Sequence, residues 1–376
     1  MKGSIFKRGK IYAVRYDIGV GGKREQKYKG GFKTKKDAQE YLNKALCEIN
    51  DGTYVKQNNV LFSTYIEEWF NNSYKMSVAE TTAETRWFYI EKHVIPYFGK
   101  TPLQMITTKK LDEFYNQKIE LGLSAKTVRE FHNLMRRAFG QAIKWSLIKI
   151  NPALDATPPK IEVKEINLWT IEQTKQFLKL LGSQNIDPIF ELIIFTGMRR
   201  GEALGLKWED IDFQKGKIRV VRSLAKTIEK GLFLKDVKTQ SSKRQISISA
   251  YLLNKLLQHK EEQSNHKKNF KETYNDQGMV FSTFEGGFKD PRNLLRDFNR
   301  LINQSGLPKI TIHDLRHLHA TQLMINGINP KVVQERLGHS RVAVTLDLYS
   351  HVNEDLQIEA AIRFENEFFK DSSIER

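Results

Sequence analysis

The sequence predicts an α+β fold with three parts: a small three-stranded sheet with one helix, a helical bundle, and a mainly helical C-terminal part with a small antiparallel sheet. Three observations predict it. β-forming and polar residues alternate near the N-terminus, long apolar stripes at helical spacing begin near residue 60, and short strand-like segments interrupt the helices after residue 165. A chain of 376 residues, 40% of them hydrophobic, can bury two or three such cores.

Residues 1–55 are expected to form the sheet and its helix. The segment IYAVRYDIG alternates β-forming and polar side chains, residues 19–22 supply a glycine-rich turn, and REQKYKGGF returns as a further strand. Thr34 then stands at an N-cap position before TKKDAQEYLNKALCEIN, in which apolar residues recur at helical spacing. One face of this helix should pack on the sheet.

Residues 60–155 are expected to form a bundle of about four helices. The first should be capped by Ser63 or Thr64, the second should cover 82–93 and stop at Pro96 and Gly99, the third should begin at Thr107 and Thr108, and Ser124 should cap the fourth. The segment 151–167 is rich in proline and charge and lacks periodicity, so we interpret it as a linker.

Residues 165–376 are expected to form the C-terminal domain. Thr170 and Gln173 have capping-box spacing at its first helix. Helices are predicted around 170–181, 187–196 and 200–207, and strands around 217–222, 233–238 and 245–248. The remainder should be mainly helical.

The charge of the chain points to a polyanionic partner. The formal net charge is +17, and residues 1–55 alone hold 13 Lys and Arg against 6 Asp and Glu. Nucleic acid is the first expectation and an anionic membrane the second. Strands can enter a DNA groove as helices can, so the cations of the N-terminal sheet are candidate DNA contacts: Lys7, Arg8, Lys10, Arg15, Arg24 and Lys27.

The same composition argues against secretion and membrane residence. Cys47 is the single cysteine, which excludes a disulfide framework and an all-cysteine zinc site within this sequence. No apolar run approaches the length of about 20 residues that spans a bilayer, and the N-terminus lacks a signal-peptide pattern. We therefore expect a cytoplasmic protein.

Several familiar sites are missing from the sequence. Neither a Gly-x-x-x-x-Gly-Lys-Ser/Thr loop nor a Gly-x-Gly-x-x-Gly fingerprint occurs, so no cradle for a nucleotide is visible. His313 and His317 have a spacing that can bind a metal on a helix, but no HExxH glutamate or nearby cysteine accompanies them. We expect no metal and no cofactor.

A dispersed set of cations and one tyrosine remains. Arg199 lies in FTGMRRGEALGLKW, His313 and Arg316 share a helical face in ITIHDLRHLHATQL, His339 follows a glycine in ERLGHS, Tyr349 lies in VTLDLYSHV, and Lys238 lies in a predicted hairpin. Taken singly, each reads as an ordinary surface cation, structural histidine or packed aromatic. Their significance lies in their ordered combination.

This order resembles the tyrosine recombinase, or phage-type integrase, family. The four resembling blocks are TGMRRGEALGL, HDLRH, LGHS and TLDLYSH, within residues 165–352, and a hairpin lysine follows the first of them. A lone RxGE or HxxR motif would be weak evidence for the family, but four blocks in this order are a specific signature of it. Residues 60–155 resemble the family's core-type DNA-binding domain, and residues 1–55 resemble the arm-type domain of integrases from temperate phages and conjugative elements of Gram-positive bacteria.

The resemblance implies a site-specific recombinase that integrates and excises a mobile element through a 3′-phosphotyrosine, without ATP or metal. It implies that Tyr349 is the nucleophile, that Arg199, Arg316 and His339 hold the phosphate, that His313 assists the tyrosine proton, and that Lys238 protonates the leaving oxygen. Glu202 and His317 would be supporting residues. Lys235 and Lys243 are alternatives to Lys238.

The implied partners are double-stranded DNA at core and arm sites, three further copies of the chain in a tetramer, a directionality factor (excisionase) and a DNA-bending protein. Leu356, Ala360, Phe364 and Phe368 recur at i, i+4 spacing, which fits a helix packed either on its own domain or on a neighbouring subunit. Rival functions are topoisomerase-like relaxation of DNA, regulation by a protein that no longer cuts, and general RNA binding.

Overall fold

The computed structural model divides the chain into two compact units, residues 1–163 and 164–376. The structure describes residues 3–18, 25–51, 54–56, 58–162, 167–184, 186–237, 242–270, 273–347, 361–362 and 364–366. The first unit holds two separate hydrophobic cores, one under the N-terminal sheet and one in a helical bundle, and the main core of the second unit lies among its helices and a small sheet.

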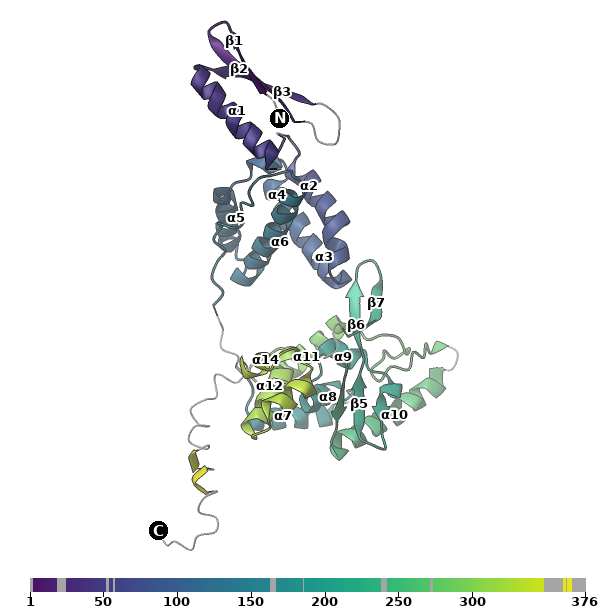
Figure 1. Ribbon diagram of the computed structural model, residues 1–376. Helices are drawn as coiled ribbons and strands as arrows, with labels where there is room; N and C mark the ends of the chain where they lie inside the picture. The colour runs from purple at the N-terminus through teal and green to yellow at the C-terminus, as the bar shows by residue number, and fades with distance from the viewer. Residues whose placement is uncertain are drawn as a thin grey trace. The chain divides into compact units, whose positions relative to one another are not determined.

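The N-terminal part is the predicted three-stranded antiparallel sheet with one helix. Its elements are β1 (Gly3–Arg8), β2 (Ile11–Asp17), β3 (Gln26–Phe32) and α1 (Lys35–Asn50), with β2 in the centre. Figure 1 shows α1 lying along one face of the sheet. Thr34 caps α1 as expected, because its hydroxyl accepts a hydrogen bond of 3.1 Å from the backbone N–H of Asp37. The predicted turn at 19–22 lies outside the described residues.

The bundle is built from helices whose bounds partly differ from those expected. They are α2 (Phe62–Trp69), α3 (Glu80–Tyr89), α4 (Ile95–Phe98), α5 (Thr108–Glu120) and α6 (Ala125–Lys144), with π-helical turns at Phe70–Tyr74 and Ile90–Val94 and short 3₁₀ turns at Lys75–Ser77 and Leu103–Met105. Thr107 and Ser124 cap α5 and α6 as predicted.

Two expectations about the bundle were wrong. Neither Ser63 nor Thr64 caps the first helix; α2 begins at Phe62, whose N–H donates to the carbonyl of Thr101. Backbone from a distant turn thus replaces a side-chain cap. The helical path also passes Pro96, because the π-helical turn Ile90–Val94 changes the hydrogen-bonding register directly before α4. The path ends at Gly99, the C-cap of α4, as expected.

The first residues of the predicted linker belong to the bundle. Ala153 and Ala156 are buried in its core, and the Asn151 side chain donates to the carbonyl of Arg136 at 2.9 Å and accepts from the N–H of Ala153. The aperiodic sequence of 151–156 therefore reflects an irregular packed segment, and a linker reading fits only residues beyond it.

The C-terminal unit is mainly helical, as predicted. Its helices are α7 (Ile171–Ser183), α8 (Ile189–Thr196), α9 (Arg200–Leu204), α10 (Ala250–Phe270), α11 (Pro291–Ser305), α12 (Ile312–Ile325), α13 (Pro330–Leu337) and α14 (Val342–Asp347), with a 3₁₀ turn at Trp208–Asp210. Its strands are β4 (Ile211–Asp212), β5 (Lys217–Val220), β6 (Arg222–Thr227), β7 (Gly231–Asp236) and β8 (Arg244–Ser247).

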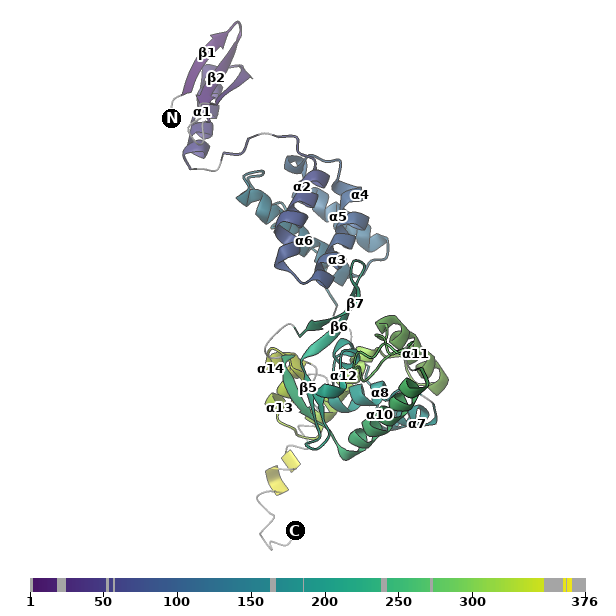
Figure 2. The same cartoon turned by 90° about the vertical axis from the view of Figure 1, so that its right-hand side faces the viewer.

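The strands form a three-stranded sheet β4-β5-β8 and a separate antiparallel hairpin β6-β7. Figures 1 and 2 both show this hairpin projecting from the body of the unit. The predicted strand 217–222 breaks at Val221, and β6 was not anticipated as a strand of its own. The predicted helix 200–207 ends at Leu204, since Gly205 is its C-cap and residues 208–210 form the 3₁₀ turn.

Helix α8 forms the centre of this unit. Ile189, Phe190, Leu192 and Ile193 are fully buried, and the helix, whose one charged residue Glu191 is also buried, packs against α9, α10 and α12. It ends at Gly197, which carries the chain into the Arg199 turn. Across the part of the chain that the structure describes, no helix is both long and apolar enough to cross a membrane.

Candidate active site and nucleic-acid interface

Arg199 is held where α8 ends and α9 begins. Gly197 adopts φ +67, and a Cβ there would lie 2.5 Å from Leu337 and 2.7 Å from His319, so this turn requires glycine. Arg199 is the N-cap residue of α9. Its Nη1 donates to Oε1 of Glu202 at 2.7 Å, and its backbone N–H donates to Oε2 at 2.9 Å. Glu202 therefore fixes both the backbone and the guanidinium of Arg199.

Arg316 projects from α12 into the interior beneath the same turn. Its side chain is only 1% exposed, and its two terminal nitrogens donate to the carbonyls of Gly197 at 2.6 Å and Leu337 at 2.7 Å. Burial, followed by the charge of Arg199, lowers the pKa of Arg316 to about 9. The guanidinium is still a cation at neutral pH.

The C-terminal end of α13 anchors three arginines. The carbonyls of its consecutive residues 336, 337 and 338 accept hydrogen bonds from Arg244 Nε, Arg316 Nη2 and Arg199 Nη2, at 2.7, 2.7 and 3.2 Å. Gly338 ends the helix with φ +67, which turns its carbonyl toward Arg199. The negative end of a helix dipole stabilises cations here as well as the hydrogen bonds do.

Histidines border this arginine cluster. His313 and His317 lie one turn apart on α12, with their rings perpendicular and their centroids 4.6 Å apart. His339 follows Gly338 and is hydrogen-bonded through Nδ1 to the hydroxyl of Thr345 at 2.9 Å. Burial is the largest cause that lowers the pKa of His313 and of His339 to about 4 each. The next cause is His317 for His313 and the charge of Arg316 for His339. Both rings are therefore neutral at pH 7.

The arrangement can bind a tetrahedral anion. A guanidinium has five N–H donors, and each terminal nitrogen carries two of them. Arg199 and Arg316 each use one N–H on each terminal nitrogen for the protein bonds described above. The remaining N–H groups of two fixed guanidiniums suit phosphate oxygens, with which they can form charge-assisted bonds.

Comparison with known proteins identifies the family. The model of the phage integrase family matches residues 170–355, that of the phage integrase N-terminal SAM-like domain matches 61–119, and that of the arm DNA-binding domain matches 4–49. A tyrosine recombinase XerC-like protein from Caldanaerobacter subterraneus subsp. tengcongensis is 30% identical over 342 residues, which cover 85% of this chain and 86% of that protein. The chain belongs to the phage integrase family of tyrosine recombinases. It is a site-specific DNA recombinase.

Two further likenesses bear on the recombinase. The ICEBs1 integrase of Bacillus subtilis is 29% identical over 341 residues, covering 89% of this chain and 90% of that integrase. The solved structure of the Tn1549 transposon integrase in complex with a circular intermediate DNA superimposes with a TM-score of 0.70 at 22% identity. It covers 81% of this chain and 99% of the solved chain, so the two share their fold.

The structure brings together four of the six residues predicted to act in the chemistry: Arg199, Arg316, His313 and His339. Lys238 and Tyr349 lie outside the described residues. A hollow of about 360 Å³ beside Arg199 is lined by Glu202, Ser223 and the end of β7 at Lys235 and Asp236. Of the two alternative lysines, Lys235 thus lines the hollow, and Lys243 is exposed just before β8.

Sequence reasoning missed Arg244 and Arg336. Arg336 donates to Nε2 of His319 at 3.0 Å, and to the carbonyls of Phe195 and Ser247, so it joins the end of α8 to α12 and β8. Arg244 contacts Glu202 directly at 2.8 Å. One signal was available: Arg244 is two residues from buried Ile246 on the same strand, so it shares the inward face.

The supporting residues differ in their surroundings. Glu202 is 3% exposed, and burial alone would raise its pKa, but the hydrogen bond from Arg244 and the charges of Arg244 and Arg199 outweigh it and lower the pKa. It is a buried carboxylate. Nδ1 of His317 is buried with no hydrogen-bond partner among the described residues. No cluster of three or more His, Cys, Asp or Glu side chains placed to hold a metal occurs in the described ranges.

The predicted DNA contacts of the N-terminal sheet fall on two faces. Pairing of Arg15 with Ser4 and Tyr28 puts it on the face opposite α1, where its guanidinium lies 5.5 Å from the Phe6 ring. Arg8 shares this uncovered face by alternation. Lys7 and Lys27 pair with Tyr12 and Tyr16 on the helix side. Lys10 lies in the β1–β2 turn, and Arg24 lies outside the described residues.

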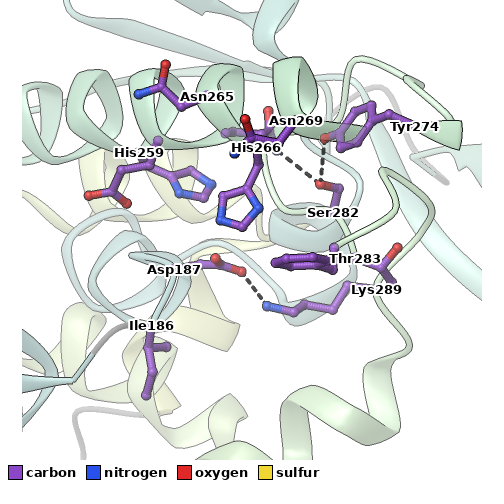
Figure 3. Close-up of a pocket in the computed structure, with 13 residues that line it drawn as sticks. Ile186, Asp187, His259, Asn265, His266, Asn269, Tyr274, Ser282, Thr283 and Lys289 are labelled. Carbon is purple, nitrogen blue, oxygen red and sulfur yellow. Dashed lines mark hydrogen bonds and ion pairs between the residues drawn. The ribbon is translucent and has the colours of Figure 1, made fainter. Parts of the chain in front are cut away.

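A second, larger hollow of about 650 Å³ lies between α10 and the segment 274–289 (Figure 3). Figure 3 shows the Asp187–Lys289 ion pair on one side and Ser282 hydrogen-bonded to Tyr274 on another. It contains none of the residues predicted to act on DNA. Some of its polar groups are bonded to one another, as in the hydrogen bond that Gln263 donates to Ser282.

Proposed function

We propose that the recombinase integrates and excises a mobile genetic element by cutting and rejoining DNA through a 3′-phosphotyrosine. The observation that carries this proposal is the pair of guanidiniums, Arg199 and Arg316, fixed by one helix end beside His339 and His313. The names of two similar proteins, the ICEBs1 integrase and the Tn1549 transposon integrase, support a mobile element as the context.

Tyr349 is the proposed nucleophile. Its oxygen attacks the scissile phosphorus, a new O–P bond to the 3′-phosphate forms, and the P–O bond to the 5′-oxygen of the next nucleotide breaks. The phosphotyrosine retains the energy of the phosphodiester, so a 5′-hydroxyl can reverse the step without ATP. No bound metal is required, because charge on the non-bridging oxygens is met by protein cations.

Arg199 and Arg316 are the proposed phosphate clamps, with His339 as a third donor. Their protein hydrogen bonds leave N–H groups free on fixed nitrogens, so little reorganisation is needed when charge develops. The bond between Nδ1 of His339 and Thr345 orients the ring and leaves Nε2 for the phosphate.

Two proton transfers accompany the exchange. A tyrosine hydroxyl with a pKa near 10 must lose its proton, and a neutral His313 can accept or position it. Lys238 is the proposed acid that protonates the leaving 5′-oxygen. His317, whose ring lies against His313, supports the orientation of that ring.

We assign residues 1–55 to arm sites, 60–155 to core sites, and 165–376 to catalysis. A homotetramer on DNA would perform strand exchange, with an excisionase setting direction and a DNA-bending protein bringing arm and core sites together. The reaction would take place in the cytoplasm.

The test is a covalent adduct. DNA flanking the gene is incubated with wild-type protein or with Tyr349→Phe, without metal or ATP, and SDS-resistant protein–DNA complexes are measured. We expect an adduct from the wild type alone, with DNA binding retained by the variant. Binding without an adduct from either protein would favour a regulator that does not cut. Relaxation of supercoiled DNA without strand exchange between two sites would favour a topoisomerase-like activity.

A further inference from the structure

Arg244 on β8 is the third arginine of the cluster, and it is enclosed by protein. Its side chain is 5% exposed. All three of its donor nitrogens are occupied: Nε donates to the carbonyl of Arg336 at 2.7 Å, Nη1 to that of Ser242 at 3.2 Å, and Nη2 to Oε2 of Glu202 at 2.8 Å. Each nitrogen of this guanidinium is therefore bonded to the protein, and one of them binds the carboxylate that also holds Arg199.

Glu202 connects Arg244 to Arg199. One carboxylate oxygen accepts from the Arg199 guanidinium, and the other accepts from both the Arg199 backbone and Arg244. Arg199 bonds to both oxygens, but only from within the α9 turn to which Glu202 itself belongs. Arg244 supplies the bond that comes from outside the α9 turn, because it lies on a strand that is paired to β5.

Arg244 also shares an anchor with both proposed clamps. The helix end that accepts from Arg316 and Arg199 accepts from Arg244 one residue earlier. A shift of β8 relative to α13 would therefore move the acceptors of the clamps as well as Glu202. The contacts of Arg244 thus fix Arg199 from two directions.

We propose that Arg244 is a positioning residue for DNA cleavage, acting through Glu202 on the guanidinium of Arg199. The inference rests on the proposed function, since it requires Arg199 to hold the scissile phosphate. Removing an outer residue that orients a site ligand costs on the order of 10- to 100-fold at well-studied metal sites, and we expect a loss of that size in the cleavage rate.

The test uses the full-length protein and a single-turnover assay of adduct formation at saturating DNA. Arg244→Gln should cleave about 10- to 100-fold more slowly than wild type with DNA affinity unchanged, and Arg244→Lys should recover part of the rate because it keeps the charge. Arg222→Gln is the matched control: Arg222 also pairs with a buried carboxylate, Asp210, at 2.9 Å, but among the described residues no hydrogen bond or ion pair joins it to Arg199, Arg316 or Glu202.

A second substrate separates positioning of Arg199 from general acid catalysis. In a 5′-bridging phosphorothiolate the P–S bond breaks, and the thiolate leaves without needing a proton. Lys238→Ala should therefore be rescued by this substrate, whereas Arg244→Gln should remain slow. In a double-variant cycle, Arg244→Gln should add little to the loss already caused by Glu202→Gln.

Four outcomes would overturn the assignment. Arg244→Gln could cleave as fast as wild type, it could be rescued by the phosphorothiolate as fully as Lys238→Ala, or its effect could multiply with that of Glu202→Gln. Equal losses in Arg244→Gln and Arg222→Gln would reduce its role to general stability. If wild-type protein forms no adduct with either substrate, the proposed function itself fails, and the assignment of Arg244 falls with it.

Discussion

Replacing Glu202 by glutamine should destabilise the C-terminal unit strongly, although the two side chains have nearly the same shape. The carboxylate is 3% exposed and accepts three hydrogen bonds of 2.7, 2.8 and 2.9 Å, two of them from guanidiniums. An amide has one acceptor oxygen, so its NH₂ group must face a cationic donor. Arg244, which is 5% exposed, would also lose its only carboxylate partner among the described residues.

The size of the loss in stability depends on how deeply the partners of Glu202 are buried. Breaking a buried ion pair by removing one member costs about 3–5 kcal/mol. Arg199 is 39% exposed and can be partly rehydrated, which places the estimate at the lower end, about 3 kcal/mol. For a unit of the size of residues 164–376, about 3 kcal/mol corresponds to a fall in Tm of roughly 6–12 °C.

Amide hydrogen exchange on the full-length protein measures this loss where it occurs. Exchange from α8, which is buried on every side, reports the free energy of opening the C-terminal unit. Glu209→Gln is the control, because Glu209 is 63% exposed and pairs with Arg222 at the surface, where an ion pair contributes under about 1 kcal/mol. If Glu202→Gln cost no more than this control, the buried carboxylate could not be the counter-ion that holds the cluster.

The dependence of stability on pH independently tests whether Glu202 is ionised in the folded protein. Because folding lowers the pKa of Glu202 below its ordinary 4.5, its stabilising contribution is fully present above that value and is lost as the pH falls through the lower pKa of the folded state. The difference in stability between wild type and Glu202→Gln should narrow in the same acid range. A difference that stays constant to strong acid would contradict an ionised Glu202.

Two more predictions concern other parts of the molecule. Burial, followed by the charges of neighbouring arginines, lowers the pKa of His319 to about 3 and that of His339 to about 4. As the pH falls from about 6.5 toward 4, the unfolded chain therefore binds protons at these two residues before the folded protein does, and the free energy of unfolding should decline. Imidazole NMR signals of these residues that titrate near pH 6.5 in the folded protein would contradict this prediction. On the uncovered face of the N-terminal sheet, Arg15→Ala should weaken binding of arm-site DNA by about tenfold, the order expected for a lost base contact, while Lys7→Ala on the helix side changes it less. Fluorescence anisotropy over a range of salt concentrations measures the DNA affinity of both variants. Equal losses of affinity would mean that Arg15 and Lys7 act only through their charge.

The features that the sequence predicted well are those whose partners are close in sequence. Thr34 caps α1 through an N–H three residues away, and Thr170 and Gln173 form the expected capping box. The start of α2 could not be predicted in the same way, because the acceptors of its first N–H groups lie near residue 100. Strand β6 was missed for a different reason: its partner β7 follows it directly, but its own sequence RSLAKT shows no clear alternation.

The candidate site shows the same division. Arg199, Arg316, His313 and His339 could be singled out as candidates from the sequence because each lies in a short block with a family pattern. Arg244 was missed because its partners, Glu202 and the carbonyl of Arg336, are 42 and 92 residues away. Alternation with Ile246 could have placed Arg244 on a buried face, but only the fold shows that the carboxylate of Glu202 lies beside it.

The charges of the cluster explain why such an enclosed arginine is useful to a DNA-cleaving site. Arg199, Arg244 and Arg316 bring three positive charges, Glu202 removes one, and the end of α13 contributes about −0.5. A cationic excess of about 1.5 therefore remains before DNA binds. A phosphodiester brings one negative charge, which leaves the balance still positive, and the additional charge that develops on the phosphoryl oxygens during attack is then met by cations already in place. In the proposed mechanism the site is thus better matched to the transition state than to the bound substrate, which is the condition for accelerating the step rather than for binding DNA more tightly. Arg244 supplies part of that excess from a position where water and salt reach it least, so its charge is screened less than that of an exposed arginine would be.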